Sequence, residues 1–257
     1  MDMNESLLRQ RPERMSEEEW RLRIELAACY RIFDFMGWSE LIYNHITMRV
    51  PGPQRHYLIN PFGLNYSEVT ASNLIKVGLD GVPVDPTPHP VNKAGFVIHS
   101  AIHAAREDAH CIMHTHTTAG IAVALKEAGL MHDDFYGAML FGRVAYHEFE
   151  GISVRTDEQP RLVRSLGDKD VLILRNHGLL VCERNIPSAF RLMWHLQRAC
   201  EVQCAGDAIP GANRILSDEV RRQSAHDGAN FEPRGQLERM VFASVLRKAG
   251  LTPDMLV

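Results

Sequence analysis

The sequence predicts an α/β protein in which helices cover both faces of a central sheet. Helical and strand-like segments alternate along the 257 residues without a break in composition, and this alternation is typical of α/β folds. The runs that read as strands are short and apolar, as in "CIM" and "VLIL", which indicates strands buried within a sheet. The sequence shows neither an internal repeat nor a low-complexity segment. We therefore predict a single α/β domain.

The N-terminal half is predicted to contain one long helix, two strands and a proline-rich loop. Ser16 and Glu19 match the S-x-x-E capping box, and the helix should run to about Met36 because Gly37 follows it. Two strands joined by the turn "PGPQ" are then expected, and after them a loop. The segments are strands at residues 42–50 and 55–60, a short helix running into a strand or turn at 70–81, and an extended surface loop with three prolines at 84–95.

The C-terminal half is predicted to alternate between helices and strands. Helices are expected at residues 96–108, 117–129, 156–168 and 185–208, and strands at 109–116, 142–150 and within 170–181. Gly129 should close the second of these helices. The tail is polar from Asn213 and helical again around residues 237–250. We divide the chain into a mobile arm at residues 1–15, one domain at 16–210, and a C-terminal extension with a terminal helix at 211–257.

Composition and charge argue against several classes of function. The formal net charge is −4 and no block of lysine and arginine stands out, so a nucleic-acid partner is not expected. The apolar runs fall short of the roughly 20 residues that cross a membrane, and the polar N-terminus has no apolar signal segment. The five cysteines include no C-x-x-C pair, which favours the cytoplasm. No G-x-G-x-x-G or Walker loop suggests a nucleotide.

Three histidines at the ends of apolar runs form a candidate metal site. His114 and His116 lie two residues apart in "CIMHTH", and in a strand such residues point to the same face. His177 follows the run "VLILRN", and Gly178 lets the backbone turn there. Ligand sites in open α/β sheets collect outside the carboxyl ends of strands. Three neutral imidazoles with a fourth place open suit a catalytic metal, although from spacing alone each could equally be an ordinary hydrogen-bonding group.

The other histidines fit structural roles better. His99 and His103 are four residues apart on an expected helix, but they lack the glutamate of H-E-x-x-H. His147 stands beside Glu148 and either reaches a cleft or lies on the surface.

Five blocks occur in order along the chain: "YNHITMR", "INPFGL", "NKAGFVIHSAIHAAREDAHCIMHTHTTAG", "VAYHEFEGI" and "VLILRNHGLLV". Together they resemble the class II aldolase/adducin head-domain family, in its adducin-like branch, over about residues 20–205. The resemblance implies an α/β/α sandwich around a central mixed sheet. It implies a homotetramer with active sites at subunit boundaries, where Tyr136 is a candidate catalytic residue. It also implies that His114, His116 and His177 bind one divalent metal, usually zinc, with Fe²⁺ or Mn²⁺ as alternatives.

Departures from the family pattern concern the substrate. Where the sugar-phosphate aldolases have a glutamate that binds the metal and moves a proton, this chain has Gly95. Where they have a serine pair for phosphate, it has Lys93 and Ala94, while Asn44 matches the family's asparagine. A lysine can still pair with an anion. We therefore expect Asn44, Lys93 and Gly95 at a site for a small anionic substrate, with a water or the substrate in the metal place that Gly95 leaves open.

The function that fits these features is a metal-dependent lyase acting on a small hydroxy-carbonyl or keto-acid substrate. Aldol cleavage and decarboxylation both pass through an enediolate that the metal stabilises, so the sequence does not separate them. The base would be Tyr136, His147 or a metal-bound hydroxide. Two alternatives remain. One is an oxidative decarboxylase with Fe²⁺ on three histidines. The other is a metal-binding but non-catalytic module like the adducin heads, which assemble on the cytoskeleton and carry a lysine-rich tail that this sequence does not show.

Overall fold

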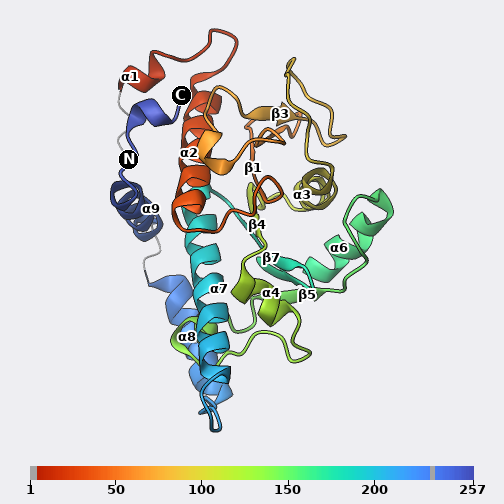
Figure 1. Ribbon diagram of the computed structural model, residues 1–257, viewed down its shortest axis with the longest axis vertical. Helices are drawn as coiled ribbons and strands as arrows, with labels where there is room; N and C mark the ends of the chain where they lie inside the picture. The colour runs from red at the N-terminus through yellow and green to blue at the C-terminus, as the bar shows by residue number, and fades with distance from the viewer. Residues whose placement is uncertain (1–4, 232–234) are drawn as a thin grey trace.

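Seven strands form one mixed sheet in the computed structural model, which describes residues 5–231 and 235–257 (Figure 1). Their order across the sheet is β3-β2-β1-β4-β7-β6-β5. Neighbouring strands are antiparallel except β5 and β6, which are parallel. The strands are β1 His45–Arg49, β2 Tyr57–Ile59, β3 Ile75–Val77, β4 Cys111–Thr115, β5 Val144–His147, β6 Val171–Leu174 and β7 Gly178–Glu183. Because β4 and β6 are both antiparallel to β7, their carboxyl ends lie at the same edge of the sheet.

Helices cover both faces of this sheet, which confirms the predicted α/β/α sandwich. On one face pack α2 Glu17–Phe35, α4 Thr118–Ala124 and α7 Ile186–Asp207, and on the other α3 Lys93–Ala105 and α6 Gln159–Leu166 (Figure 1). The helices outside these layers are α1 Glu5–Leu8, α5 Phe135–Met139, α8 Asp218–Asn230 and α9 Gln236–Lys248. Of these, α8 packs against α5, and α9 packs against α7.

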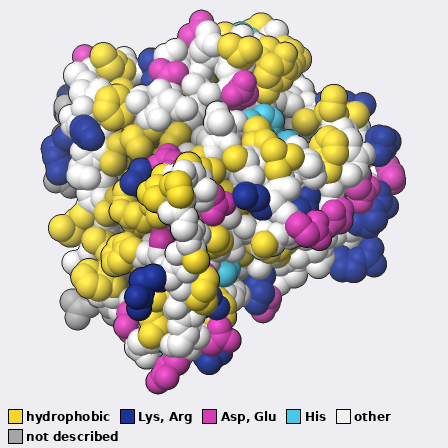
Figure 2. Space-filling model, turned by 60° about the horizontal axis from the view of Figure 1, so that its bottom comes forward, with side chains coloured by type: hydrophobic (Ala, Val, Ile, Leu, Met, Phe, Trp, Pro, Cys, Tyr) yellow, Lys and Arg dark blue, Asp and Glu magenta, His cyan; other side chains and the backbone are white. Residues whose placement is uncertain are grey.

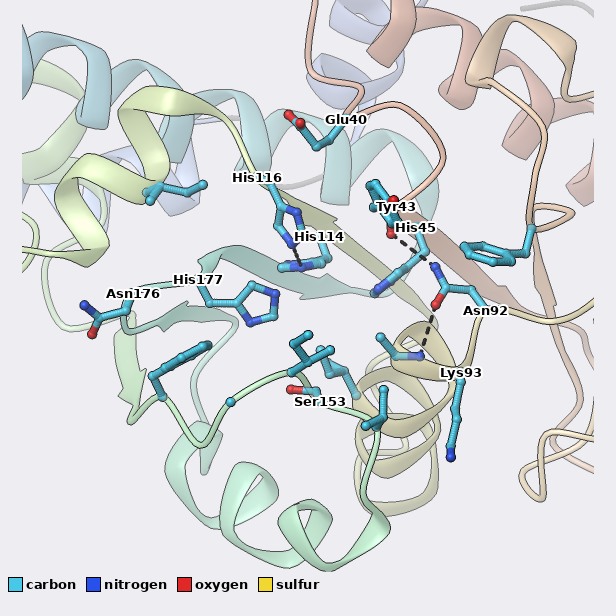
Figure 3. A pocket seen from close by; sticks show the side chains of 18 of the residues that line it. Glu40, Tyr43, His45, Asn92, Lys93, His114, His116, Ser153, Asn176 and His177 are labelled. Atoms are coloured by element: carbon cyan, nitrogen blue, oxygen red, sulfur yellow. Dashed lines mark hydrogen bonds between the residues drawn. The ribbon is translucent and has the colours of Figure 1, made fainter.

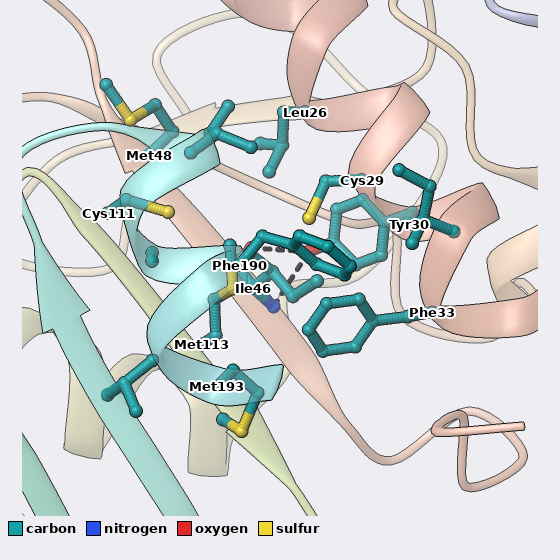
Figure 4. Packing of buried hydrophobic residues seen from close by; sticks show 14 of the residues in the cluster. Leu26, Cys29, Tyr30, Phe33, Ile46, Met48, Cys111, Met113, Phe190 and Met193 are labelled. Carbon is teal, nitrogen blue, oxygen red and sulfur yellow. Dashed lines mark hydrogen bonds between the residues drawn. The ribbon is translucent and has the colours of Figure 1, made fainter. Parts of the chain in front are cut away.

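The larger hydrophobic core lies between the sheet and helices α2 and α7 (Figure 4). Phe33 of α2 and Phe190 of α7 pack with their ring centroids 6.3 Å apart, and both side chains are fully buried. The Tyr30 hydroxyl accepts hydrogen bonds from the backbone N–H groups of Ile46 and Asn60 at 2.9 and 3.1 Å. These bonds connect α2 to the two strands behind it, so the start of β1 is held in a fixed position.

Side chains alternate between the two faces of the sheet and thereby place the polar residues of β1. Ile46 and Met48 belong to the core beneath α2 and α7. The residues between and beside them therefore point to the α3 side. His45 and Thr47 accordingly form hydrogen bonds with side chains of α3. A buried polar layer between β1 and α3 results.

The segment at residues 170–181 contains two strands, where one was expected. β6 ends at Leu174 and β7 begins at Gly178, so "RNH" is a tight connection between antiparallel neighbours. Both strands are almost wholly buried, so each reads as a short apolar run, and three residues separate the two runs. His177 therefore lies between two strands.

Other differences arise at helix starts. Residues 71–73 form a turn where a short helix was expected, and β3 follows in place of the expected strand or turn. α3 begins at Lys93, within the expected loop, because the Asn92 side chain accepts hydrogen bonds from the N–H groups of Ala94 and Gly95. α8 lies in the polar part of the tail, for which no helix was predicted. Ser16 caps α2 as predicted.

Two further details concern the N-terminal part. The Glu19 carboxylate does not complete the capping box, because it pairs with Arg23 and Lys76 at 2.9 and 3.0 Å. The expected mobile arm, residues 1–15, lies partly outside the described residues. Its described part includes Leu7 and Met15, which are both buried in the larger core. The division at residues 15 and 210 stays a prediction.

Within the described residues, every helix is too short or too polar to cross a membrane.

Candidate metal centre and its cavity

Three histidine rings meet at the edge of the sheet where β4 ends and β7 begins (Figure 3). His114 belongs to β4, His116 follows that strand directly, and His177 lies in the connection from β6 to β7. One ligand nitrogen from each residue lies within 4.8 Å of the others, and the ring centroids are 4.6 to 4.8 Å apart. The structure thus brings together all three histidines singled out in the sequence, in an arrangement that can hold one cation. We call them the histidine triad.

The connection between β6 and β7 explains how His177 reaches the other two rings. Asn176 adopts a left-handed conformation with φ of 58°, which asparagine tolerates better than most residues. The N–H of His177 donates to the carbonyl of Leu174 at 3.1 Å and closes the turn. Gly178 is not among the glycines with positive φ. Its role is close approach, since a Cβ atom there would stand 2.3 Å from the carbonyl oxygen of Thr115.

Hydrogen bonding and burial prepare the triad for a metal. Nδ1 of His114 donates to the carbonyl of Leu179 at 2.9 Å, so its Nε2 is bare in the neutral ring. That Nε2 lies 2.7 Å from Nε2 of His116, which must then donate the shared proton. Burial lowers the pKa of all three rings, and that of His177 to about 4. Neutral imidazoles are the form that binds metal, so the residues present fit a divalent cation.

The triad lies in the wall of a cavity of about 1110 Å³. Figure 3 shows Lys93 and Asn92 on one side of it and Asn176 on the other. Glu40 is the one carboxylate among the described residues that line the cavity, and its charge raises the pKa of His116 against the larger effect of burial. Much of the remaining wall is apolar. Its apolar members include Phe62, Val91, Ile98, Ile121, Leu125, Phe149, Ile152 and Val154.

Several residues expected at the site do not line this cavity in one chain. Asn44 is buried, and its Nδ2 donates to the carbonyl of Trp38 at 3.0 Å. His147 is enclosed by Ser165 and Glu158, at 3.0 and 3.4 Å from its ring nitrogens. Tyr136 packs edge-on against a tryptophan of α7. Lys93 does line the cavity, as expected.

His45 lies at this site although it was not predicted from the sequence. It pairs with His114 across β1 and β4, and its ring lies 5.0 Å from the His114 ring. A Cβ atom at Gly95 would stand 2.9 Å from Cγ of His45 and 3.2 Å from Ile59. The His45 ring therefore fills the space directly beside Gly95, and the open place expected on the metal stays a prediction. A glutamate at this position would have to displace His45.

Behind His45, a buried chain of polar side chains runs between β1 and α3. Nδ1 of His45 lies 2.9 Å from Nε2 of His99, and Nδ1 of His99 lies 2.8 Å from the Thr47 hydroxyl. The same hydroxyl lies 2.8 Å from Nε2 of His103, whose Nδ1 lies 3.0 Å from the carbonyl of Ala109. Both helix histidines are thus structural, as the sequence analysis favoured. We call these four side chains, from His45 to His103, the buried histidine chain.

Acid should destabilise the protein partly through this chain. Burial lowers the pKa of His103 to about 3, against about 6.5 in an unfolded chain. Between these values the unfolded state binds the extra proton, so the free energy of unfolding falls as pH drops below about 6.5. Each such histidine contributes about 1.4 kcal/mol per pH unit. In His103→Gln, urea titrations from pH 7 to 4 should show a slope smaller by about that amount. If the free energy of unfolding of His103→Gln depended on pH as steeply as that of the wild type, the lowered pKa of His103 would be contradicted.

One face of the molecule shows charges of both signs beside each other, with hydrophobic patches between them (Figure 2). Histidine atoms reach this surface among hydrophobic side chains. Lysine and arginine side chains stand beside acidic and apolar ones on this face.

Comparison with known proteins gives a family and three similar proteins. The family model described as "Class II Aldolase and Adducin N-terminal domain" matches residues 24–204. The crystal structure of an aldolase II superfamily protein from Pseudomonas syringae has a TM-score of 0.86 at 43% identity, covering 92% of this chain and 95% of that one. An L-fuculose 1-phosphate aldolase from Glaciozyma antarctica PI12 has a TM-score of 0.79 at 28% identity, covering 96% and 98%. Alpha-adducin of Rattus norvegicus is 45% identical over 88% of this chain, which spans 32% of that protein.

Proposed function

We propose, from the premise that the chain belongs to the class II aldolase and adducin family, that it is a metal-dependent lyase of the aldolase type. Its substrate would be a small anionic hydroxy-carbonyl compound or keto acid. The observation that carries the proposal is the triad of neutral imidazoles in the wall of a large cavity. The likeness to a solved L-fuculose 1-phosphate aldolase, at 28% identity, supports aldolase-like chemistry.

The histidine triad is the proposed ligand set of one divalent metal, with zinc the first choice and Fe²⁺ or Mn²⁺ as alternatives. Zinc binds imidazole nitrogen at about 2.0–2.1 Å. Two ligands would then stand about 3.3 Å apart in a tetrahedral site, so the rings of His114 and His116 need to separate only slightly from their 2.7 Å contact. A metal here would supply positive charge beside the substrate oxygens, where negative charge develops as a carbon–carbon bond breaks.

Lys93 is the proposed partner for the anionic end of the substrate. It lies at the first position of α3 and lines the cavity. The backbone N–H groups of Ala94 and Gly95 donate to the Asn92 side chain, so they do not bind an anion. The Lys93 ammonium is therefore the group at this helix start that can pair with one. The apolar side chains around the cavity would keep water away from the reacting atoms and so strengthen these charges.

A neighbouring subunit would have to supply Tyr136 if that residue takes part. In one chain Tyr136 packs edge-on against a tryptophan of α7 and does not line the cavity. We propose a homotetramer in which active sites lie at subunit boundaries, and light scattering at micromolar protein would test the assembly. His147 is not retained as the base, because its ring is buried beside Ser165 and Glu158 and does not line the cavity.

A non-catalytic module is the second candidate, because alpha-adducin is 45% identical over 88% of this chain. The lyase and the non-catalytic module could both bind a metal at the triad, but only the lyase would convert a substrate. An oxidative decarboxylase using Fe²⁺ would differ from both by consuming oxygen.

Metal analysis followed by an activity screen tests the proposal. After dialysis, the wild type should retain about one zinc per chain, and His177→Ala should retain none. The zinc-, manganese- and iron-loaded forms are then offered small hydroxy acids, hydroxyketones and keto acids, with aldehyde, carbon dioxide and oxygen uptake followed. Release of aldehyde or carbon dioxide that depends on His177 supports the lyase. Bound metal without turnover favours the module, and a wild type without affinity for metal refutes both.

A further inference from the structure

The direction of every hydrogen bond in the buried histidine chain can be worked out from its far end. A carbonyl oxygen only accepts, so Nδ1 of His103 donates to Ala109. The neutral ring of His103 then has a bare Nε2, which accepts from the Thr47 hydroxyl. Having given its one proton away, that hydroxyl accepts from Nδ1 of His99. Nε2 of His99 is therefore bare and accepts from Nδ1 of His45.

This order leaves Nε2 of His45 without a proton. All three rings of the chain are buried, and no hydrogen bond or ion pair among the described residues joins them to a carboxylate, so each ring is neutral and carries one proton only. His45 lines the cavity, and Figure 3 shows its ring reaching in from β1 on the side of the triad. No described residue forms a hydrogen bond with its Nε2. The cavity wall therefore presents a fixed acceptor at this point.

His45 stands beside the triad without belonging to it. Among the described residues, the group whose ligand atoms lie within 4.8 Å of one another contains the triad without His45. A group bound next to the metal can nevertheless reach His45, because the ring centroids of His45 and His114 are 5.0 Å apart.

We propose that Nε2 of His45 accepts a hydrogen bond from a hydroxyl group of the substrate, and that the buried chain behind it keeps it an acceptor. The inference rests on the proposed function, because a metal on the triad must place the substrate. A hydroxyl can donate a hydrogen bond to this nitrogen. A carbonyl, carboxylate or ionised phosphate oxygen only accepts, so its lone pair would be repelled by the lone pair of the nitrogen. The site therefore selects hydroxy compounds over keto compounds at this position. His45 is a substrate-binding residue, and Thr47 is a positioning residue that has no contact with the cavity.

The first test reads the tautomer directly and needs no variant. Nitrogen-detected NMR on histidine-labelled protein, with and without zinc, should show a bare Nε2 and a protonated Nδ1 on His45. In Thr47→Val the chain loses its middle hydroxyl, so His45 should populate the opposite tautomer. Thr47→Ser keeps the hydroxyl and should behave like the wild type. A protonated Nε2 in the wild type would overturn the inference.

The second test measures the preference for a hydroxyl. Glycolate and fluoroacetate differ by a hydroxyl that donates and a fluorine that does not, and calorimetry gives the affinity of each for the zinc-loaded protein. The ratio of the two affinities should fall by about three- to tenfold in His45→Phe and in Thr47→Val, which is the net value of one hydrogen bond. Thr47→Ser should keep the wild-type ratio.

The outcomes separate this inference from the proposed function. Zinc binding is measured first on each protein, so a wild type that binds no zinc refutes the proposed function before any ligand is added. If zinc binds and the ratio is the same in the wild type and in His45→Phe, the proposed function stands and the role of His45 is refuted.

Discussion

Replacing His114 with alanine is expected to abolish zinc binding. The residue is fully buried, and its Nδ1 is fixed by the carbonyl of Leu179, so the variant lacks one of the three proposed ligand nitrogens. Loss of an outer-shell partner alone costs about 10- to 100-fold in metal affinity, and loss of a ligand should cost more. Calorimetry with zinc and metal analysis after dialysis measure the effect.

The matched control for this variant is His226→Ala. His226 is exposed on α8, far from the triad in the sequence and outside the cavity. It should leave the zinc content unchanged and thereby exclude surface histidines as the source of binding. Circular dichroism should show both variants folded. If His114→Ala kept one tightly bound zinc per chain, the ligands would have to lie elsewhere and the proposed metal centre would be wrong.

The parts of the fold that could be predicted are those whose signal is local. α7 was predicted almost to the residue, because Asn185 caps it and its apolar residues recur at helical spacing. The β6–β7 hairpin was not predicted as two strands, since both are buried and the turn has a single left-handed residue, Asn176, as its mark. α8 contains no buried residue, so it has no apolar periodicity to read.

At the site, too, residues with a local sequence signal were predicted and residues without one were not. The triad was predicted because His114 and His116 share a strand face and because the carboxyl ends of β4 and β6 meet at one edge. His45 depends on the register that sets it opposite His114, and that pairing joins segments almost 70 residues apart in the sequence. Thr47 and the two helix histidines become partners only when α3 packs on β1. Such contacts join residues that are distant in the sequence, so no regular spacing of residue types reveals them.

Gly178→Ala is expected to damage both the fold and the metal centre, although residue 178 is not a ligand. A Cβ atom there would stand 2.3 Å from the backbone oxygen of Thr115 and 3.2 to 3.3 Å from the rings of His116 and His114. The backbone of β4 or β7 must shift to relieve the first contact, because a peptide oxygen cannot rotate away as a side chain can. Overpacking of this kind typically lowers the free energy of unfolding by about 1–3 kcal/mol.

The same shift should weaken zinc binding by about 10- to 100-fold, the range found when groups that orient metal ligands are lost. Gly206→Ala is the control, because Gly206 lies within α7 and a Cβ atom added there would meet no heavy atom within 4 Å. That variant should keep full zinc affinity and gain up to about 1 kcal/mol of stability, since alanine favours the helix over glycine. Urea unfolding and zinc calorimetry on the two variants separate the effects. The added methyl group would press on two of the three rings of the triad. If Gly178→Ala nevertheless bound zinc as tightly as the wild type, the triad would not depend on the close approach of β4 and β7.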